Sequence, residues 1–163
     1  MRSTPERSGA GETLKVCAAH LDCAVDGLRQ ASDQETIARG LLARAELHRV
    51  TGALEKAARD LDEAFSIATR GGMRLHEADC HLEYVRLYLA QLSLRGAGFA
   101  TKQSPGDTEI ASHPSTLLRT LAMTPELLKE KAREHLAKAK EMIKEMGYHR
   151  RDQEVKELEE RLP

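Results

Sequence analysis

A seven-residue signature occurs three times in this chain and limits the folds that the chain can adopt. Its copies read Cys17-x₃-Leu21-x₂-Ala24, Ala57-x₃-Leu61-x₂-Ala64 and Ala132-x₃-Leu136-x₂-Ala139. The second copy begins 40 residues after the first, and the third begins 75 residues after the second. In a helix, this spacing places three apolar residues on one face and lets another helix approach closely. Recurrence at such intervals is typical of stacked helical repeats, so the sequence favours a fold for recognition over one for catalysis.

The composition supports packed helices and argues against some partners. The chain has 163 residues, enough for one domain with a sizeable core, and only 3% of them are aromatic, with no Trp. Charged residues make up 31% of the chain, yet the net charge is −1. The charge-rich stretch from Glu126 to Leu162 is balanced, with ten basic and ten acidic residues. We therefore expect no nucleic-acid partner and a solvated helical surface over this stretch.

The cysteines and the N-terminal residues indicate a cytoplasmic protein without a membrane span. The odd count of three, Cys17, Cys23 and Cys80, fits reduced thiols better than a disulfide framework. The first residues contain no apolar signal-peptide core, and no apolar run approaches the length that spans a bilayer.

Helix start and stop signals divide the chain into helices. Ser32 and Glu35 have the spacing of a capping box, and Gly52 follows the next apolar pattern as a stop. Thr124 and Pro125 are typical of a helix N-terminus. The pattern predicts five long helices, stacked as antiparallel neighbours in a right-handed array, and a shorter last helix. The expected ranges are about 14–28, 33–51, 54–69, 75–94, 125–146 and 152–162.

The predicted organisation is one repeat domain with a tail and an insertion. Residues 1–12 are polar and predict a disordered tail, and residues 13–162 form the single domain. Loop-forming residues predict an insertion at about 93–124, whose length accounts for the larger second offset. We expect a mobile loop there, with at most a short helix around 115–122 that docks on the array or on a partner.

The signature resembles the second helix of a tetratricopeptide repeat, whose pattern is Ala-x₃-Phe-x₂-Ala. The preceding residues 41–49 and Gly52 resemble the first helix of that repeat and its tight turn. The period of 40 is longer than the usual 34, and the Trp and terminal Pro of the family are missing. Longer variants of this kind resemble helical arrays of bacterial signalling ATPases and transcription regulators, and a period of 40 also suits HEAT-type repeats. The resemblance implies a short right-handed α-solenoid.

The same resemblance implies a non-catalytic module that binds a protein or peptide on its concave face, with no cofactor. In the family this face is lined by the first helix of each pair. Carried over position by position, it consists of Arg39, Leu42, Glu46 and Arg49 from one copy, and Asp79, Leu82, Arg86 and Leu89 from the other. For the leucines at 42, 82 and 89, burial in the core is the competing interpretation.

Catalytic and metal-binding alternatives have little support in the sequence. His76 and Cys80 lie four residues apart, so one helix face could offer both to a metal, and His20 and Cys23 form a similar pair. No sequence rule places a third ligand beside either pair. Cys80 also aligns with Gly40, which indicates a small packing position. A small metalloenzyme or a ligand-binding helical bundle remains a distant alternative, and we expect no bound metal.

The first copy of the signature lacks the helix that should precede it. Only a short polar stretch comes before Leu14, although the signature aligns with the second helix of a repeat. We therefore expect an open apolar face formed by Leu14, Cys17, Leu21 and Leu28. Either the chain is a piece of a longer protein, or a second copy packs on this face and the chain is a self-associating scaffold segment, with a homodimer as the expected form.

Overall fold

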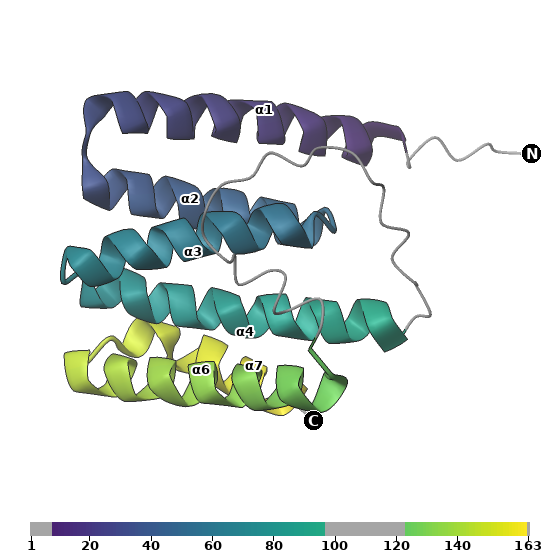
Figure 1. Ribbon diagram of the computed structural model, residues 1–163, viewed down its shortest axis with the longest axis vertical. Coiled ribbons are helices and arrows are strands. Elements are labelled where there is room, and N and C mark those ends of the chain that lie inside the picture. The colour runs from purple at the N-terminus through teal and green to yellow at the C-terminus, as the bar shows by residue number, and fades with distance from the viewer. Residues whose placement is uncertain (1–7, 97–122, 163) are drawn as a thin grey trace, which may run out of the picture. The chain divides into compact units, whose positions relative to one another are not determined.

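A computed structural model describes residues 8–96 and 123–162, and these residues are helical apart from short turns (Figure 1). The predicted all-α class is confirmed for this part of the chain, which has no strand. The expected loop and short helix within 97–122 fall outside the described residues, as do residues 1–7. The α-helices are α1 (Ser8–Ala31), α2 (Gln34–Val50), α3 (Leu54–Arg70), α4 (Arg74–Gly96), α6 (Pro125–Met146) and α7 (Asp152–Arg161), with a 3₁₀ turn, η1 (His149–Arg151), before α7.

Local capping explains both ends of α6 and the start of α2. The Thr124 side chain accepts a hydrogen bond from the backbone N–H of Leu127, and Pro125 opens α6 as expected. Gly147 closes α6 with φ 67°, a left-handed conformation in which a side chain would be strained. The predicted capping box at Ser32 is wrong, because Asp33 caps α2 by accepting from the N–H of Glu35.

Two helices are longer than the sequence predicts. Helix α1 begins at Ser8, so the part of the expected tail from Ser8 to Glu12 is helical. Helix α4 continues to Gly96, past the expected start of the insertion at 93. Each added residue of a formed helix gains a hydrogen bond without a new nucleation cost, which extends helices into residues of low propensity.

The chain divides into two compact units, Met1–Glu77 and Ala78–Pro163, and the division falls within α4. In the first unit α1, α2 and α3 follow one another as antiparallel neighbours joined by short turns (Figure 1). A Cβ at Gly40 would lie 3.0 Å from Leu28 Cδ1 and 3.4 Å from Val25 Cγ2, so the absence of a side chain there lets α1 approach α2. Gly40 is therefore a small packing position, as predicted.

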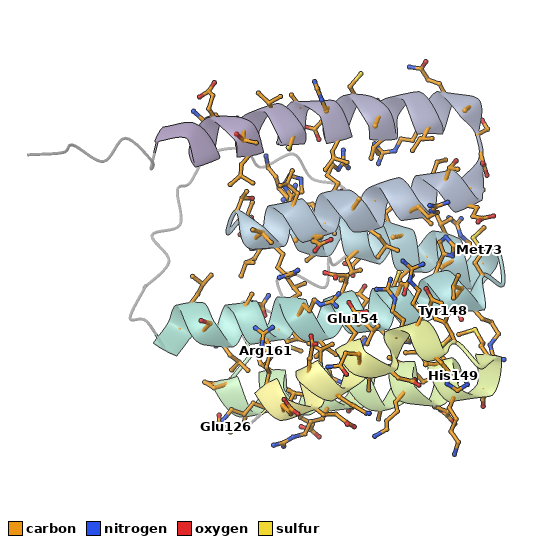
Figure 2. The ribbon with its side chains drawn as sticks, turned by 180° about the vertical axis from the view of Figure 1, so that it is seen from behind. Met73, Glu126, Tyr148, His149, Glu154 and Arg161 are labelled. Carbon is orange, nitrogen blue, oxygen red and sulfur yellow. The ribbon has the colours of Figure 1, made fainter. Side chains whose placement is uncertain are left out.

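In the second unit α4, α6, η1 and α7 pack together. Helices α4 and α6 run antiparallel, and η1 with α7 returns along both (Figures 1 and 2). Figure 2 shows Glu154 on the side of α7 that faces α4. The buried apolar residues of α6 and α7 are Leu128, Ala132, Leu136, Ala139, Met142, Ile143, Val155 and Leu158.

The three copies of the signature differ in burial. In α3 and α6 all three signature residues are buried, as predicted for Leu61, Ala64, Leu136 and Ala139. In α1 Cys17 and Ala24 are exposed and Leu21 is only half-buried. The prediction that Leu21 is buried is therefore wrong. Val25, one turn further on, is 0% exposed and is the fully buried residue within 11–31 of α1.

Candidate interaction surfaces

The predicted partner-binding residues of α2 form an accessible row along that helix. Arg39 and Glu46 are exposed, whereas Leu42 and Arg49 are half-buried. Arg49 Nη2 lies 3.8 Å from Glu46 Oε1, one helical turn away. The row presents both charges around an apolar residue. We call Arg39, Leu42, Glu46 and Arg49 the α2 row.

The equivalent residues of α4 are occupied by contacts within the second unit. Asp79 accepts hydrogen bonds from Arg151 of η1, at 3.0 Å from Nε and 2.9 Å from Nη2. Arg86 donates to Glu154 of α7 and to Glu83 on its own helix.

The exposure of these α4 residues agrees with their internal contacts. Leu82 is 1% exposed, and Leu89 is half-buried. The expectation that Leu82 lines a partner surface is therefore wrong, because Leu82 is core. Helix α7 holds Arg86 and η1 holds Asp79, and their contact with a partner stays a prediction.

A buried ion pair joins the two helices of the hairpin α2–α3. Arg44 binds Asp60 with two hydrogen bonds, Nε to Oδ2 at 2.8 Å and Nη2 to Oδ1 at 2.7 Å. Its Nη1 also lies 3.1 Å from Asp22 of α1, which links all three helices. His48 Nε2 lies 3.7 Å from Asp60 Oδ2, and burial lowers the pKa of His48. The paired geometry satisfies the buried charges of this unit.

A cluster of rings joins α4 to α6 in the second unit. The Nδ1 atoms of His81 and His135 are 2.8 Å apart, so one must donate to the other. The His135 ring centroid lies 4.7 Å from that of Tyr84 and 5.7 Å from that of Tyr88. The sequence analysis did not identify this cluster, because the two histidines lie 54 residues apart and share no motif.

The ion pair and the ring cluster occupy the same positions of the repeat. The two residues on α2 become their equivalents on α4 when 40 is added to their numbers, and the residue on α3 becomes its equivalent on α6 when 75 is added. These offsets are those of the repeat. The equivalent residues are Arg44 and Tyr84, His48 and Tyr88, and Asp60 and His135. Each pair of helices therefore meets through the same three positions, with different chemistry. The sequence signature could have identified the third position, because Asp60 and His135 each immediately precede the Leu of their signature copy.

The equivalent position of the first signature copy is His20, which is exposed. The side of α1 that carries His20 also exposes Val16, Cys17, Cys23, Ala24 and Gly27. We call these six residues the α1 face. It contains no acidic residue, Lys or Arg, and a Cβ at Gly27 would meet nothing within 4 Å. Of the residues predicted for self-association, Leu14 and Cys17 are exposed, whereas Leu21 and Leu28 are half-buried. Leu28 lies toward Gly40 of α2.

The weak metal candidate, His76 with Cys80, is buried within α4. His76 is 7% exposed, and Cys80 is 0% exposed. His76 Nε2 has no hydrogen-bond partner among the described residues. No three His, Cys, Asp or Glu side chains in residues 8–96 and 123–162 are grouped so that they could hold a metal ion. The pair alone offers two ligands, fewer than the three protein ligands of a catalytic zinc site.

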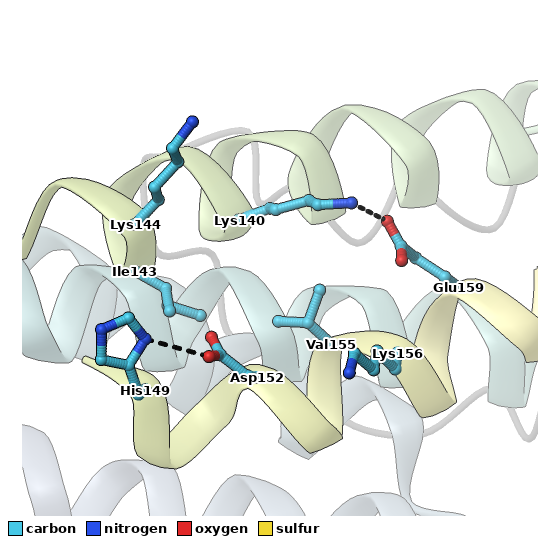
Figure 3. A pocket seen from close by; sticks show the side chains of 8 residues that line it. All are labelled: Lys140, Ile143, Lys144, His149, Asp152, Val155, Lys156 and Glu159. Atoms are coloured by element: carbon cyan, nitrogen blue, oxygen red, sulfur yellow. Dashed lines mark hydrogen bonds and ion pairs between the residues drawn. The ribbon is translucent and has the colours of Figure 1, made fainter. Parts of the chain in front are cut away.

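Helices α6 and α7 enclose a surface groove of about 290 Å³ (Figure 3). Its two carboxylates each have a partner: Lys140 Nζ lies 2.6 Å from Glu159 Oε1, and His149 Nδ1 lies 3.0 Å from Asp152 Oδ2. The pair of Lys140 and Glu159 neutralises part of the charge of the groove. Its lining residues are Lys140, Ile143, Lys144, His149, Asp152, Val155, Lys156 and Glu159.

Acidification is expected to destabilise the protein through His135. Burial, the neighbouring His81 and Lys131 lower the pKa of His135 to about 4, against the raising effect of Glu134. The unfolded chain takes up this proton near pH 6.5, so the stability is complete above pH 6.5 and is lost as the pH falls toward 4. Because His135 is partly accessible, we expect a loss of about 1–3 kcal/mol rather than the full effect.

Chemical denaturation at several pH values between 7 and 4.5 measures this loss. In His135→Phe the ring contacts remain without a titrating group, so the curve should be flatter than that of the wild type. Identical pH dependence of the two proteins would contradict the assignment to His135.

Comparison with known proteins gives no family: no protein-family model, no curated protein and no solved structure matches the chain. Within the part of the chain that the structure describes, no helix is both long enough and apolar enough to cross a membrane.

Proposed function

We propose that this chain is a non-catalytic protein-binding module built from tetratricopeptide-like helix pairs. The observation that carries the proposal is the equivalence of the two pairs, in which the contacts of Asp60 and His135 fall at the same repeat positions. In a repeat of this kind, buried polar groups join neighbouring helices, and exposed rows of side chains are available for recognition. The resemblance of the signature to the tetratricopeptide pattern agrees with this interpretation.

The α2 row is the best candidate for the contact with a protein or peptide partner. It keeps Arg39 and Glu46 exposed, with Leu42 between them, whereas η1 and α7 hold the charged residues of the equivalent row of α4. Opposite charges flanking an apolar residue fit a segment with complementary charges and one apolar anchor.

Charge reversal of the α2 row tests the proposal. Affinity capture with the full chain supplies a partner, and titration of the purified partner measures its dissociation constant. We expect Arg39→Glu combined with Glu46→Lys to weaken binding about tenfold or more, as for the loss of well-placed charge pairs. Lys138→Glu with Glu141→Lys is the matched control, because these residues of α6 are also exposed and oppositely charged.

The control pair should bind like the wild type. Equal weakening by both double variants, or no partner that binds the purified chain, would overturn the assignment of the α2 row.

A self-associating scaffold is the alternative function, favoured by the α1 face, which is exposed and has no acidic residue, Lys or Arg. Sedimentation of the full chain separates the two functions, because a scaffold of this kind forms a concentration-dependent dimer that Ala24→Glu dissociates. Metal or small-ligand binding is the more distant alternative, and metal analysis of the purified protein tests it at His76 and Cys80.

A further inference from the structure

We propose that the α1 face is a docking site for an amphipathic helix of a partner protein, and that residue 20 selects the side chains that this helix must carry. The inference rests on the proposed function and specifies one class of partner. It concerns a different surface from the α2 row, so the two can fail separately.

The faces of α3 and α6 that are equivalent to the α1 face are each covered by another helix. On α3, this face carries Asp60, and the antiparallel helix α2 lies on it and supplies Arg44. On α6, the face carries His135, and the antiparallel helix α4 lies on it and supplies Tyr84 and Tyr88. In both cases the covering helix contributes two side chains four residues apart, one helical turn, since His48 of α2 also lies 3.7 Å from Asp60. Helix α4 adds a third side chain, His81, whose Nδ1 lies 2.8 Å from Nδ1 of His135.

The α1 face has the same arrangement, and no helix among residues 8–96 and 123–162 covers it. Cys17, His20 and Ala24 align with Ala57, Asp60 and Ala64 of α3, which are buried. All three residues of α1 are exposed. A helix face with mostly small side chains and no acidic residue, Lys or Arg is a surface on which another helix can lie closely, and its exposure leaves that contact unused.

The chemistry of residue 20 specifies the occupant. Residue 20 is a histidine, like His135, and the helix that covers His135 presents two tyrosines. We infer a partner helix with aromatic residues at i and i+4. Where this position is an aspartate, as at Asp60, the covering helix provides Arg and His side chains that contact its carboxylate.

A foreign helix fits the α1 face better than a second copy of α1. Apart from Val16 and His20, the α1 face is made of small side chains, and it contains no Phe, Tyr or Trp. Two such faces would bury little apolar area against each other, whereas large side chains of a partner would fill the space above Ala24 and Gly27.

Two peptides and two proteins test the proposal directly. The first peptide has the α2 sequence, residues 34–50, and the second has the same sequence with Arg44→Tyr and His48→Tyr. The full chain is used as wild type and as His20→Asp. We expect His20→Asp to prefer the arginine peptide by about tenfold, the effect of a charged hydrogen bond. We expect the wild type to prefer the tyrosine peptide by about fivefold, the effect of aromatic ring contacts.

A pair of variants on one helix locates the binding site. Ala24→Glu places a charge in the α1 face and should abolish binding of both peptides. Ala19→Glu makes the same change at an exposed residue outside that face and should leave binding unchanged. Circular dichroism and denaturation of both variants confirm that they fold alike.

Three results would overturn the proposal. The first is that neither protein binds either peptide. The second is that wild type and His20→Asp prefer the same peptide. The third is that Ala24→Glu and Ala19→Glu affect binding equally. A dimer that Ala24→Glu dissociates would also overturn it, because a second copy would then occupy the face. None of these results would affect the partner contact tested at the α2 row.

Discussion

Leu61→Ala is expected to lower the free energy of unfolding by about 2–5 kcal/mol, the cost of truncating a fully buried leucine. Leu61 is 1% exposed and lies between Ala57 and Ala64, which are also buried. These small neighbours cannot extend into the space that the leucine leaves, so a cavity remains in a close-packed interior. Urea denaturation measures the loss as a lower midpoint.

Leu21→Ala is the matched control, because Leu21 holds the same signature position in α1 and is only half-buried. Its truncation removes less buried surface and should cost about 0.5–1.5 kcal/mol. Equal losses for the two variants would show that Leu21 is as deeply buried in solution as Leu61.

Asp60→Ala is expected to cost about 2–4 kcal/mol, because it leaves the guanidinium of Arg44 buried without its principal partner. The side chains of Arg44 and Asp60 are 13% and 9% exposed. Asp22, which still accepts one hydrogen bond from Arg44 at 3.1 Å, keeps the loss below that of an ion left entirely unpaired. Denaturation at pH 7 measures the difference from the wild type.

Glu63→Ala removes a carboxylate of the same helix and provides the control. Glu63 pairs with Arg29 at 2.7 Å, but the two side chains are 42% and 41% exposed. An exposed pair of this kind contributes little, so we expect a loss of less than about 1 kcal/mol.

A double variant separates ion pairing from packing at the same site. Arg44→Met with Asp60→Leu should recover most of the stability, because two apolar side chains leave no buried charge. A double variant no more stable than Asp60→Ala would show that the pair is needed for the packing of α2 on α3.

The sequence determined which segments of the described chain are helical and which residues end α6. Thr124 and Gly147 act as predicted, because capping depends on residues within one turn of the helix end. The signature likewise predicted the burial of Leu61 and Leu136. Local chemistry did not settle every detail, since Asp33 replaced Ser32 as the cap of α2.

The candidate site was predictable only in part. Arg39 and Glu46 are exposed as a binding row requires, whereas Asp79 and Arg86 are held by Arg151 and Glu154. Those partners lie 72 and 68 residues away in the chain, and no pattern within α4 indicates that they return to it. Contact at such separation is a property of the packed unit and cannot be read from one helix.

The three signature copies show what the sequence determines and what the tertiary structure determines. Ala24, Ala64 and Ala139 have the same place in the same pattern, and each lies on an α-helix as the sequence requires. Ala64 and Ala139 are 0% exposed, whereas Ala24 is exposed. A helix face is apolar because of its own residues, but it is buried only when another element lies on it. The sequence therefore determined the faces, and the tertiary structure decided which of them are covered.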